Sequence, residues 1–334
     1  MATIRIDGSD SEFECAADDV ILRAALRAGL GLPYECNVGS CGNCRFELLE
    51  GAVEHERSDP PAWSERDLKR NRYLGCQARP LGDCRIKVRR DDNSRSLHRP
   101  VRIRATLVDR RPITHDISEF AFELSNPSGF RPGQYALLAV PGVTGNRAYS
   151  MCHPPEAGKP WRFQIKRVPG GSATTRLFDG LAPGDEIGFD GPYGNAWLRE
   201  DAPRDILCIA GGSGLSPMIA VARAAAASPA LAGRQIHFLY GGRAPRDICG
   251  EDMLRALPGW GERIHYHAAI SETGHTGWTG STGFVHELAG TLFGDRLAAH
   301  EVYFAGPPAM AQAVQKLLFD AKVPAEQVHF DEFF

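Results

Sequence analysis

The sequence has no long hydrophobic run and no excess of basic residues, and each absence excludes a class of protein. No apolar stretch approaches the length that spans a bilayer, and acidic side chains interrupt the N-terminal segment where a signal peptide needs apolar residues, namely Asp7, Asp10, Glu12 and Glu14. A formal net charge of -3 leaves no basic surplus to neutralise nucleic-acid phosphates. We therefore expect a cytoplasmic protein that binds neither membranes nor nucleic acid.

The chain of 334 residues is long enough for two or three domains, each with its own core. Alternating apolar residues over 3–6 and 12–15 predict a hairpin, which a helix over 20–28 follows, and residues 84–88 predict a closing strand. Residues 89–100 are polar and lack apolar periodicity. We therefore predict a first domain over residues 1–90 and an exposed linker over 91–100.

The remaining residues show two different patterns of predicted secondary structure. Short alternating strands between Gly and Pro turns, as at residues 103–107, 136–140 and 163–166, predict an antiparallel β-barrel over residues 101–199. Apolar strands at 206–210, 236–240 and 302–305, with a helix over 216–227, predict an α/β domain with a parallel sheet over residues 200–334.

The cysteines carry the strongest single pattern. Nine of them, an odd number, fit a secreted disulfide framework poorly, whereas clustered cysteines in a cytosolic chain indicate metal or cluster ligation. Cys36, Cys41 and Cys44 form C-x4-C-x2-C with Cys76 distant in sequence, the plant-type spacing for a 2Fe-2S cluster. Zinc is the alternative, although it usually takes two close pairs or a pair plus histidines. Cys84 competes for the fourth ligand position, but its alternating apolar neighbours predict a buried strand position.

A glycine turn follows the first strand of the α/β region. Gly211-Gly212-Ser213-Gly214 leads into a helix whose N-terminal N–H groups would face a diphosphate, and Pro217 suits the first turn of that helix. The turn does not form the G-x-S-x-G elbow of a hydrolase, because the last glycine position of that motif is occupied by a leucine.

Three cysteine-containing segments resemble the plant-type ferredoxin domains that are fused to oxygenase reductases: Pro33-Tyr34-Glu35-Cys36, Cys41-Gly42-Asn43-Cys44 and Leu74-Gly75-Cys76-Gln77. This resemblance covers the first domain. It implies a β-grasp fold of the α+β class that passes one electron at a time through the cluster.

The middle region is similar to the flavin domain of the ferredoxin-NADP reductase superfamily, through Arg147-Ala148-Tyr149-Ser150 and an upstream Pro132-Gly133-Gln134-Tyr135. The resemblance implies that Arg147 holds the FAD pyrophosphate, Tyr149 packs on the flavin and Ser150 bonds near its N5 atom, so Ser150 and Tyr149 are the candidate catalytic residues. FMN is the lesser alternative to FAD. A second flavin element is expected at Lys166 and at Gly171, Ser172, Ala173 and Thr174.

The glycine turn resembles the superfamily's nicotinamide-nucleotide loop G-G-[ST]-G-[IL]-x-P-M. Ala305 departs from the pattern, because many relatives carry cysteine there. The acidic Glu272 beside Ser271 disfavours a 2'-phosphate, so NADH is expected in preference to NADPH, although Arg243 and Arg246 keep NADPH open. The implied nucleotide-binding residues are Gly211, Gly212, Ser213, Gly214, Pro217, Arg243, Ser271, Gly306 and Pro307.

The tail over residues 328–334 is similar to the aromatic C-termini of reductases that serve aromatic-ring dioxygenases and toluene or phenol monooxygenases, and Phe334 is a candidate shield for the flavin. The resemblance implies a relay from NADH to FAD to the 2Fe-2S cluster, and on to a Rieske-type or other ferredoxin or to an oxygenase hydroxylase component acting on an aromatic substrate. The alternatives are the same relay serving deoxysugar dehydration, and a non-catalytic iron-sulfur sensor. We expect a monomer.

Overall fold

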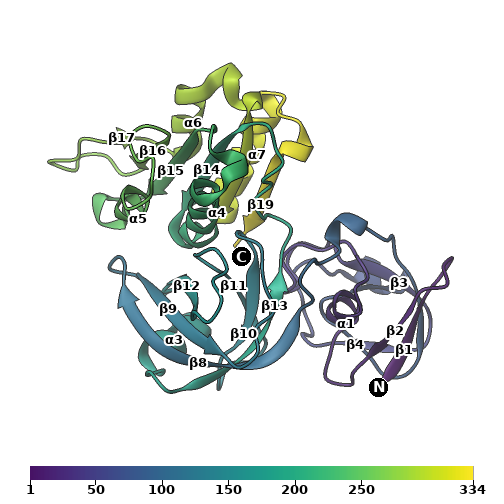
Figure 1. Ribbon diagram of the computed structural model, residues 1–334. Coiled ribbons are helices and arrows are strands. Elements are labelled where there is room, and N and C mark those ends of the chain that lie inside the picture. The colour runs from purple at the N-terminus through teal and green to yellow at the C-terminus, as the bar shows by residue number, and fades with distance from the viewer. Residues whose placement is uncertain (334) are drawn as a thin grey trace.

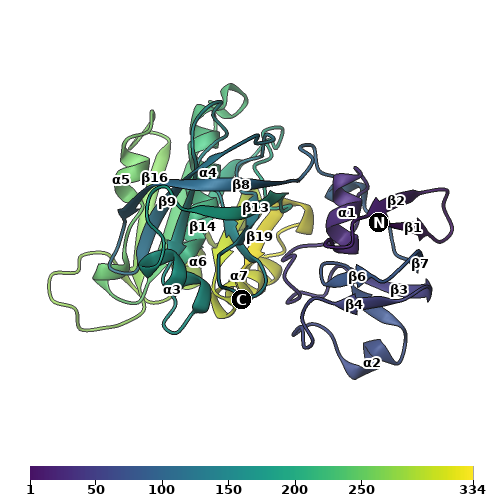
Figure 2. The same ribbon diagram turned by 90° about the horizontal axis from the view of Figure 1, so that it is seen from below.

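The computed structural model describes residues 1–333, which form three sheet-based units in chain order (Figure 1). The N-terminal unit stands to one side of the other two in both views (Figures 1 and 2). Among the described residues, no helix combines the length and the apolar character that crossing a membrane requires.

The N-terminal unit is built on a mixed sheet of five strands in the order β2-β1-β7-β3-β5, and it has the predicted β-grasp fold. The predicted hairpin, helix and closing strand are confirmed, and Gly29, with φ +83°, follows the end of the helix. Its elements are β1 (Ala2–Ile6), β2 (Glu12–Cys15), α1 (Ile21–Arg27), β3 (Arg45–Glu50), β4 (Val53–His55), α2 (Glu65–Leu68), β5 (Arg72–Leu74), β6 (Ala78–Pro80) and β7 (Cys84–Lys87).

The middle unit is the predicted antiparallel barrel, with six strands in the order β11-β10-β13-β8-β9-β12. A bridge between Met151 and Phe163 joins the region after β11 to β12, so the sheet is nearly closed around an aromatic core. Its elements are β8 (Val101–Pro112), β9 (Ile117–Leu124), β10 (Tyr135–Ala139), β11 (Arg147–Ser150), β12 (Trp161–Lys166), α3 (Ser172–Asp179) and β13 (Glu186–Tyr193).

The C-terminal unit is the predicted Rossmann-like domain, with a parallel sheet in the order β17-β16-β15-β14-β18-β19. Alternate residues of β14 enter two cores, one shared with α4 and the other with α6 and α7, so helices cover both faces of the sheet. Its elements are β14 (Asp205–Gly211), α4 (Leu215–Ala227), β15 (Ile236–Gly242), α5 (Glu251–Arg255), β16 (Ile264–Ile270), β17 (Ser281–Thr282), α6 (Val285–Phe293), β18 (His300–Gly306), α7 (Pro308–Asp320) and β19 (Val328–Glu332).

The segment over residues 91–100 is mostly exposed or half-buried, but Ser94 and Pro100 are buried. It contains a 3-10 turn, Asp92–Ser94, and Ser94 is buried because its hydroxyl accepts a hydrogen bond of 3.2 Å from the Asn195 amide of the barrel unit. The N–H of Asp91 donates to the Gly31 carbonyl at 3.1 Å. A polar composition predicts exposure on average, but here specific hydrogen bonds hold the segment against both neighbouring units.

Candidate functional site

The four predicted cluster ligands come together at one edge of the N-terminal unit. Cys36, Cys41 and Cys44 lie in the loop between α1 and β3, and Cys76 follows β5. Two backbone N–H groups, those of Ser40 and Cys41, each donate to the Cys36 sulfur at 3.3 Å. The N–H of Cys76 donates to the Cys44 sulfur at 3.5 Å. These donors favour thiolates over thiols.

The four cysteines fall into two pairs. A hydrogen bond from the Cys41 thiol is the largest of the effects that lower the pKa of Cys36, to about 6, and the Cys76 thiol lowers the pKa of Cys44 in the same way. Within residues 1–333, no three cysteine sulfurs lie within 4.8 Å of one another. Two pairs suit two iron atoms, whereas one tetrahedral zinc ion would draw all four sulfurs to about 4 Å from one another. The residues present therefore fit a 2Fe-2S cluster.

The cysteine loop is tied to the barrel unit by tyrosines. Tyr135 of β10 donates to the backbone carbonyl of Glu35 at 2.5 Å, directly before the ligand Cys36. On the neighbouring strand β11, Ser150 pairs with Tyr135. Tyr135 therefore contacts the cysteine loop through its side chain and pairs with the predicted flavin strand through its backbone.

Buried ion pairs join the same two units. Arg27 of α1 donates to Asp190 of β13 at 2.7 Å and forms a short ion pair with Asp19. Arg102 of β8 reaches Asp19 at 2.6 Å. Burial alone would raise the pKa of Asp19, but Arg27 and Arg102 hold it below its usual value. The network fixes the N-terminal unit on the barrel.

The predicted flavin residues line one face of the barrel. Arg147, Tyr149 and Ser150 lie on β11, and burial raises the pKa of Tyr149 to about 12. Thr174, near the start of α3, accepts the N–H of Val168 through its hydroxyl at 3.1 Å, which shapes the turn before the helix. The N-terminal N–H groups of α3 would suit a phosphate.

The predicted nucleotide residues lie at the carboxyl ends of parallel strands. Gly211, Gly306 and Ser271 lie at or next to the ends of β14, β18 and β16, the edge at which such sheets bind ligands. A Cβ added to Gly214 would lie 1.9 Å from the Ala305 carbonyl oxygen, so only glycine permits this contact between the turn and β18. Ala305, the departure from the family pattern, is buried in β18.

A cavity of about 2220 Å³ is lined by residues of all three units and reaches Cys36, a predicted cluster ligand. Three of the predicted nucleotide-binding residues do not line it, namely Gly214, Pro217 and Gly306, and of the four predicted cluster ligands only Cys36 does. Phe334 lies outside the described residues, but Phe333 lines the cavity, whereas Phe330 stacks on Phe304 within the domain. The predicted residues that line it are Arg147, Tyr149, Ser150, Lys166, Gly171, Ser172, Ala173, Thr174, Gly211, Gly212, Ser213, Arg243, Ser271 and Pro307.

Sequence reasoning missed three side chains at this cavity. The Ser216 hydroxyl donates to the Ser150 carbonyl at 2.6 Å and accepts the N–H of Gln164 at 3.1 Å, which joins the nucleotide helix to the barrel. Met310 covers Gly211, where an added Cβ would meet its sulfur at 2.6 Å. Asp331 is buried, with one carboxylate oxygen unpartnered. No local motif signals these residues, since their roles depend on contacts between units.

Fold and cavity together define an NAD(P)H-dependent flavoprotein oxidoreductase with an iron-sulfur domain. Residues 4–81 match the family described as "2Fe-2S iron-sulfur cluster binding domain". Residues 104–197 match "Oxidoreductase FAD-binding domain" and residues 208–316 match "Oxidoreductase NAD-binding domain". The first match overturns the zinc alternative, and the second supports FAD over FMN.

Relatives along the whole chain serve oxygenase systems. The ferredoxin-NAD(P)(+) reductase CarAd of Metapseudomonas resinovorans is 36% identical and covers 100% of both chains. The ferredoxin-NAD(+) reductase component of the alkene monooxygenase system of Xanthobacter autotrophicus is 36% identical over 96% of this chain and 97% of its own. A solved structure, the ferredoxin reductase in carbazole 1,9a-dioxygenase, has a TM-score of 0.92 and 35% identity, covering 100% of this chain and 98% of its own.

The chain belongs to the family of oxygenase-system reductases, which carry electrons from NAD(P)H through FAD and a 2Fe-2S cluster towards a ferredoxin or an oxygenase component. It is therefore an enzyme, and the interpretation as a non-catalytic sensor is wrong.

Proposed function

We propose that this chain supplies electrons from NADH to an oxygenase that hydroxylates an aromatic substrate, with a Rieske-type ferredoxin as the immediate acceptor. The observation that carries the proposal is the cavity that extends from Cys36 past Arg147, Tyr149 and Ser150 to the Gly211 turn. When bound there, FAD takes two electrons as a hydride and releases them singly to the cluster. Residues of all three units thus line the same cavity.

The flavin would be held by side chains of the barrel. Arg147 offers a guanidinium to the pyrophosphate, and Tyr149 an aromatic face to the ring system. Ser150 offers its hydroxyl near the reacting edge, and residues 171–174 place the N-terminal N–H groups of α3 around the phosphates. The Lys166 amino group, also predicted to bind there, instead pairs with Asp116 at 3.0 Å, beside the Gly212 turn. Phe333, which reaches the cavity, takes the shielding role predicted for the terminal phenylalanine.

The dinucleotide would lie on the carboxyl edge of the parallel sheet. Gly211, Gly212 and Ser213 line the cavity there and admit a diphosphate close to the backbone. Two further residues act through packing, because Gly214 supports the turn against β18 and Pro217 lies in the first turn of α4. Gly306 ends β18, and Pro307, which follows it, lines the cavity.

We propose NADH as the electron donor. Arg243 and Ser271 line the cavity where the adenine ribose would lie, and Glu272 follows directly. A carboxylate at this position repels a 2'-phosphate and suits a ribose hydroxyl. The kcat/KM for NADH should exceed that for NADPH at least tenfold, and Glu272→Arg should narrow the ratio; equal use of both nucleotides by the wild type would contradict the assignment.

The flavin assignment is tested by flavin content. Arg147→Ala should lower the FAD bound per chain after gel filtration, while the iron content stays unchanged. Arg255→Ala is the matched control, because Arg255 lies on α5 and pairs with Glu251 at 2.6 Å. Full FAD occupancy in Arg147→Ala would contradict the assignment of Arg147 to the flavin site.

The acceptor is tested by reconstitution. The holoenzyme and NADH are mixed anaerobically with a Rieske-type ferredoxin, with an isolated hydroxylase component, or with an iron-sulfur dehydratase of the deoxysugar class. Rapid reduction of the ferredoxin supports the proposal. Preferential reduction of the dehydratase would replace the oxygenase partner, and direct reduction of the hydroxylase alone would remove the ferredoxin step.

Three organisational features belong to the same proposal. The domains run over residues 1–90, 101–199 and 200–334 with the segment 91–100 between them, in accord with the three sheets. We propose a monomer, which light scattering of the holoenzyme would test. A cytoplasmic location suits an enzyme that draws on the NADH pool, and cell fractionation would test it.

A further inference from the structure

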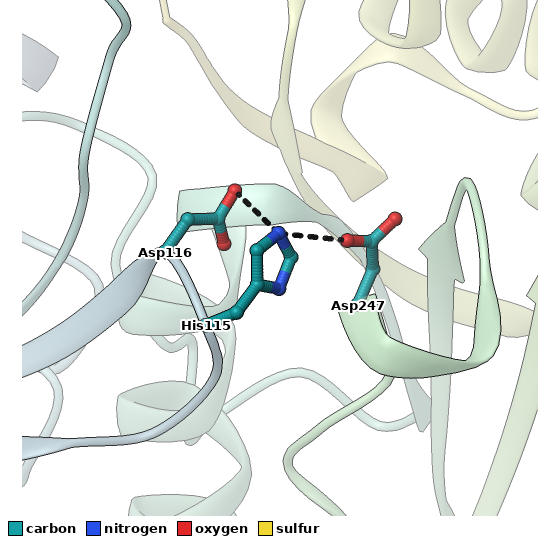
Figure 3. A group of neighbouring side chains, drawn as sticks. All are labelled: His115, Asp116 and Asp247. Carbon is teal, nitrogen blue, oxygen red and sulfur yellow. Dashed lines mark ion pairs between the residues drawn. The ribbon is translucent and has the colours of Figure 1, made fainter.

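Three side chains outside the electron-transfer path converge at the junction of the barrel and the nucleotide unit (Figure 3). His115 and Asp116 lie in the turn between β8 and β9, and Asp247 ends the 3-10 turn Pro245–Asp247 after β15. The Nε2 atom of His115 lies 3.6 Å from an Asp116 oxygen and 3.7 Å from an Asp247 oxygen. Among residues 1–333, this is the one group of three metal-ligand side chains with all ligand atoms within 4.8 Å.

The Asp247 carboxylate has one satisfied oxygen and one unsatisfied oxygen. Its Oδ2 atom accepts the N–H groups of Arg243 and Ala244 at 2.9 and 3.0 Å, which fixes the orientation of the side chain. Its Oδ1 atom is buried without a hydrogen-bond partner and faces His115, and the residue is 7% exposed. A buried carboxylate oxygen without a partner is unfavourable unless a proton donor or a cation completes its surroundings.

We propose that His115, Asp116 and Asp247 form a binding site for a divalent transition metal of the Zn²⁺ type, joining the two units. Imidazole nitrogen and carboxylate oxygen bind zinc at about 2.0–2.2 Å, which places tetrahedral ligand atoms about 3.4 Å apart. The two separations from the His115 nitrogen, 3.6 and 3.7 Å, are close to this value, and the two carboxylates, whose ligand atoms lie within 4.8 Å of each other, would have to close on the ion. His115 is 38% exposed at its side chain, so an ion can reach the site from solvent, and water would supply the fourth ligand.

Neighbouring positively charged side chains influence the affinity of this site for a metal ion. The Lys166 amino group lies 3.0 Å from the same Asp116 oxygen that faces His115, and the Arg243 guanidinium lies 3.9 Å from Asp247 Oδ2. A carboxylate oxygen has more than one lone pair, so Asp116 can keep Lys166 and still accept a metal ion, but the positive charges oppose a dication. Binding should therefore be weaker than at a structural zinc site.

The site lies at the edge of the cavity, which Asp247, Lys166 and Arg243 also line. An ion bound there would link the β8–β9 turn to the strand end that carries Arg243. It would add a coordinate link between two units that are otherwise held by hydrogen bonds and packing.

The test is zinc binding to the FAD- and cluster-loaded enzyme. Wild type, His115→Ala, Asp247→Asn and His275→Ala are dialysed against dilute Zn²⁺, and zinc and iron per chain are measured together. We expect about one zinc ion per chain in the wild type and in His275→Ala, and a loss of most of it in the other two. His275 is the control because it pairs with Glu272 outside the group.

Equal zinc in the wild type and in His115→Ala would overturn the proposal. A zinc content that rises only as the iron content per chain falls would also overturn the proposal, because that zinc would have replaced iron at the cluster cysteines. Asp247 also accepts two backbone N–H groups, so Asp247→Asn can lose zinc through a folding defect. His115→Ala changes an exposed side chain and tests the site without that defect. Circular dichroism of each variant verifies that its fold is retained.

Discussion

Asp331→Asn should stabilise the protein at alkaline pH. Burial, with the charge of Glu35 second, raises the pKa of Asp331 from 3.8 to about 7, and one of its oxygens has no hydrogen-bond partner. Because the folded protein holds this proton above pH 3.8 while the unfolded chain releases it, folding stability falls as the pH rises from 3.8 to about 7 and changes no further above that.

The size of the effect follows from the two pKa values. A rise from 3.8 to about 7 corresponds to about 4 kcal/mol of lost stability at pH 8. Relaxation and water reduce such penalties, so we expect a gain of roughly 2 kcal/mol for the asparagine variant at pH 8 and about half of it at pH 5.5. In a unit of this size, the gain at pH 8 is a rise in Tm of roughly 4–8 °C.

Calorimetry of the holoenzyme at the two pH values measures this difference. Asp320→Asn is the control, because Asp320 is exposed on α7 and pairs with Lys316 at 2.6 Å. A gain in Tm that is the same at both pH values, or a loss at pH 8, would refute the argument that the ionised carboxylate is penalised by burial.

Two further changes test contacts between units, and a third tests packing within the nucleotide unit. Tyr135→Phe removes the hydrogen bond to the cysteine loop and should weaken the docking of the N-terminal unit on the barrel by about 1 kcal/mol. The cluster absorption should then be lost at a lower temperature. The control, Tyr73→Phe within the N-terminal unit, should leave that temperature nearly unchanged. Arg27→Met leaves two carboxylates short of a partner and should destabilise the protein by about 3 kcal/mol in urea unfolding; an unchanged midpoint would contradict the role of the network. Gly214→Ala places a methyl carbon against the carbonyl of Ala305 in β18 and should destabilise the nucleotide unit by about 3 kcal/mol, measured by calorimetry. The control is Gly233→Ala, which should match the wild type because no atom lies near its added Cβ.

The sequence predicted the parts of the fold that depend on local patterns. Alternating residues predicted strands of the first two units, apolar runs predicted three strands of the parallel sheet, and the spacing of Cys36, Cys41 and Cys44 predicted the iron-sulfur loop. The alternation of strands and helices after residue 200 predicted a parallel sheet, and Gly211 and Ser271 lie at its carboxyl edge. These features follow from neighbours in sequence, so a single chain is sufficient to read them.

The contacts between units were not predictable in the same way. Ser216 occupies a variable position of the glycine loop, and its bond to the Ser150 carbonyl depends on how two domains dock. Asp331 reads as an ordinary polar residue near the C-terminus, yet it is buried opposite Glu35 of the first domain. Both depend on pairs that are more than sixty residues apart, which no local pattern records.

The Ser216 hydroxyl also has a kinetic consequence. It bonds to β11 and to β12 at once, so the nucleotide unit cannot swing away from the barrel without breaking both bonds. Turnover should therefore proceed without a large opening of the enzyme. Local side-chain motion at the cavity, and not a hinge between the units, would then govern the exchange rate of the dinucleotide.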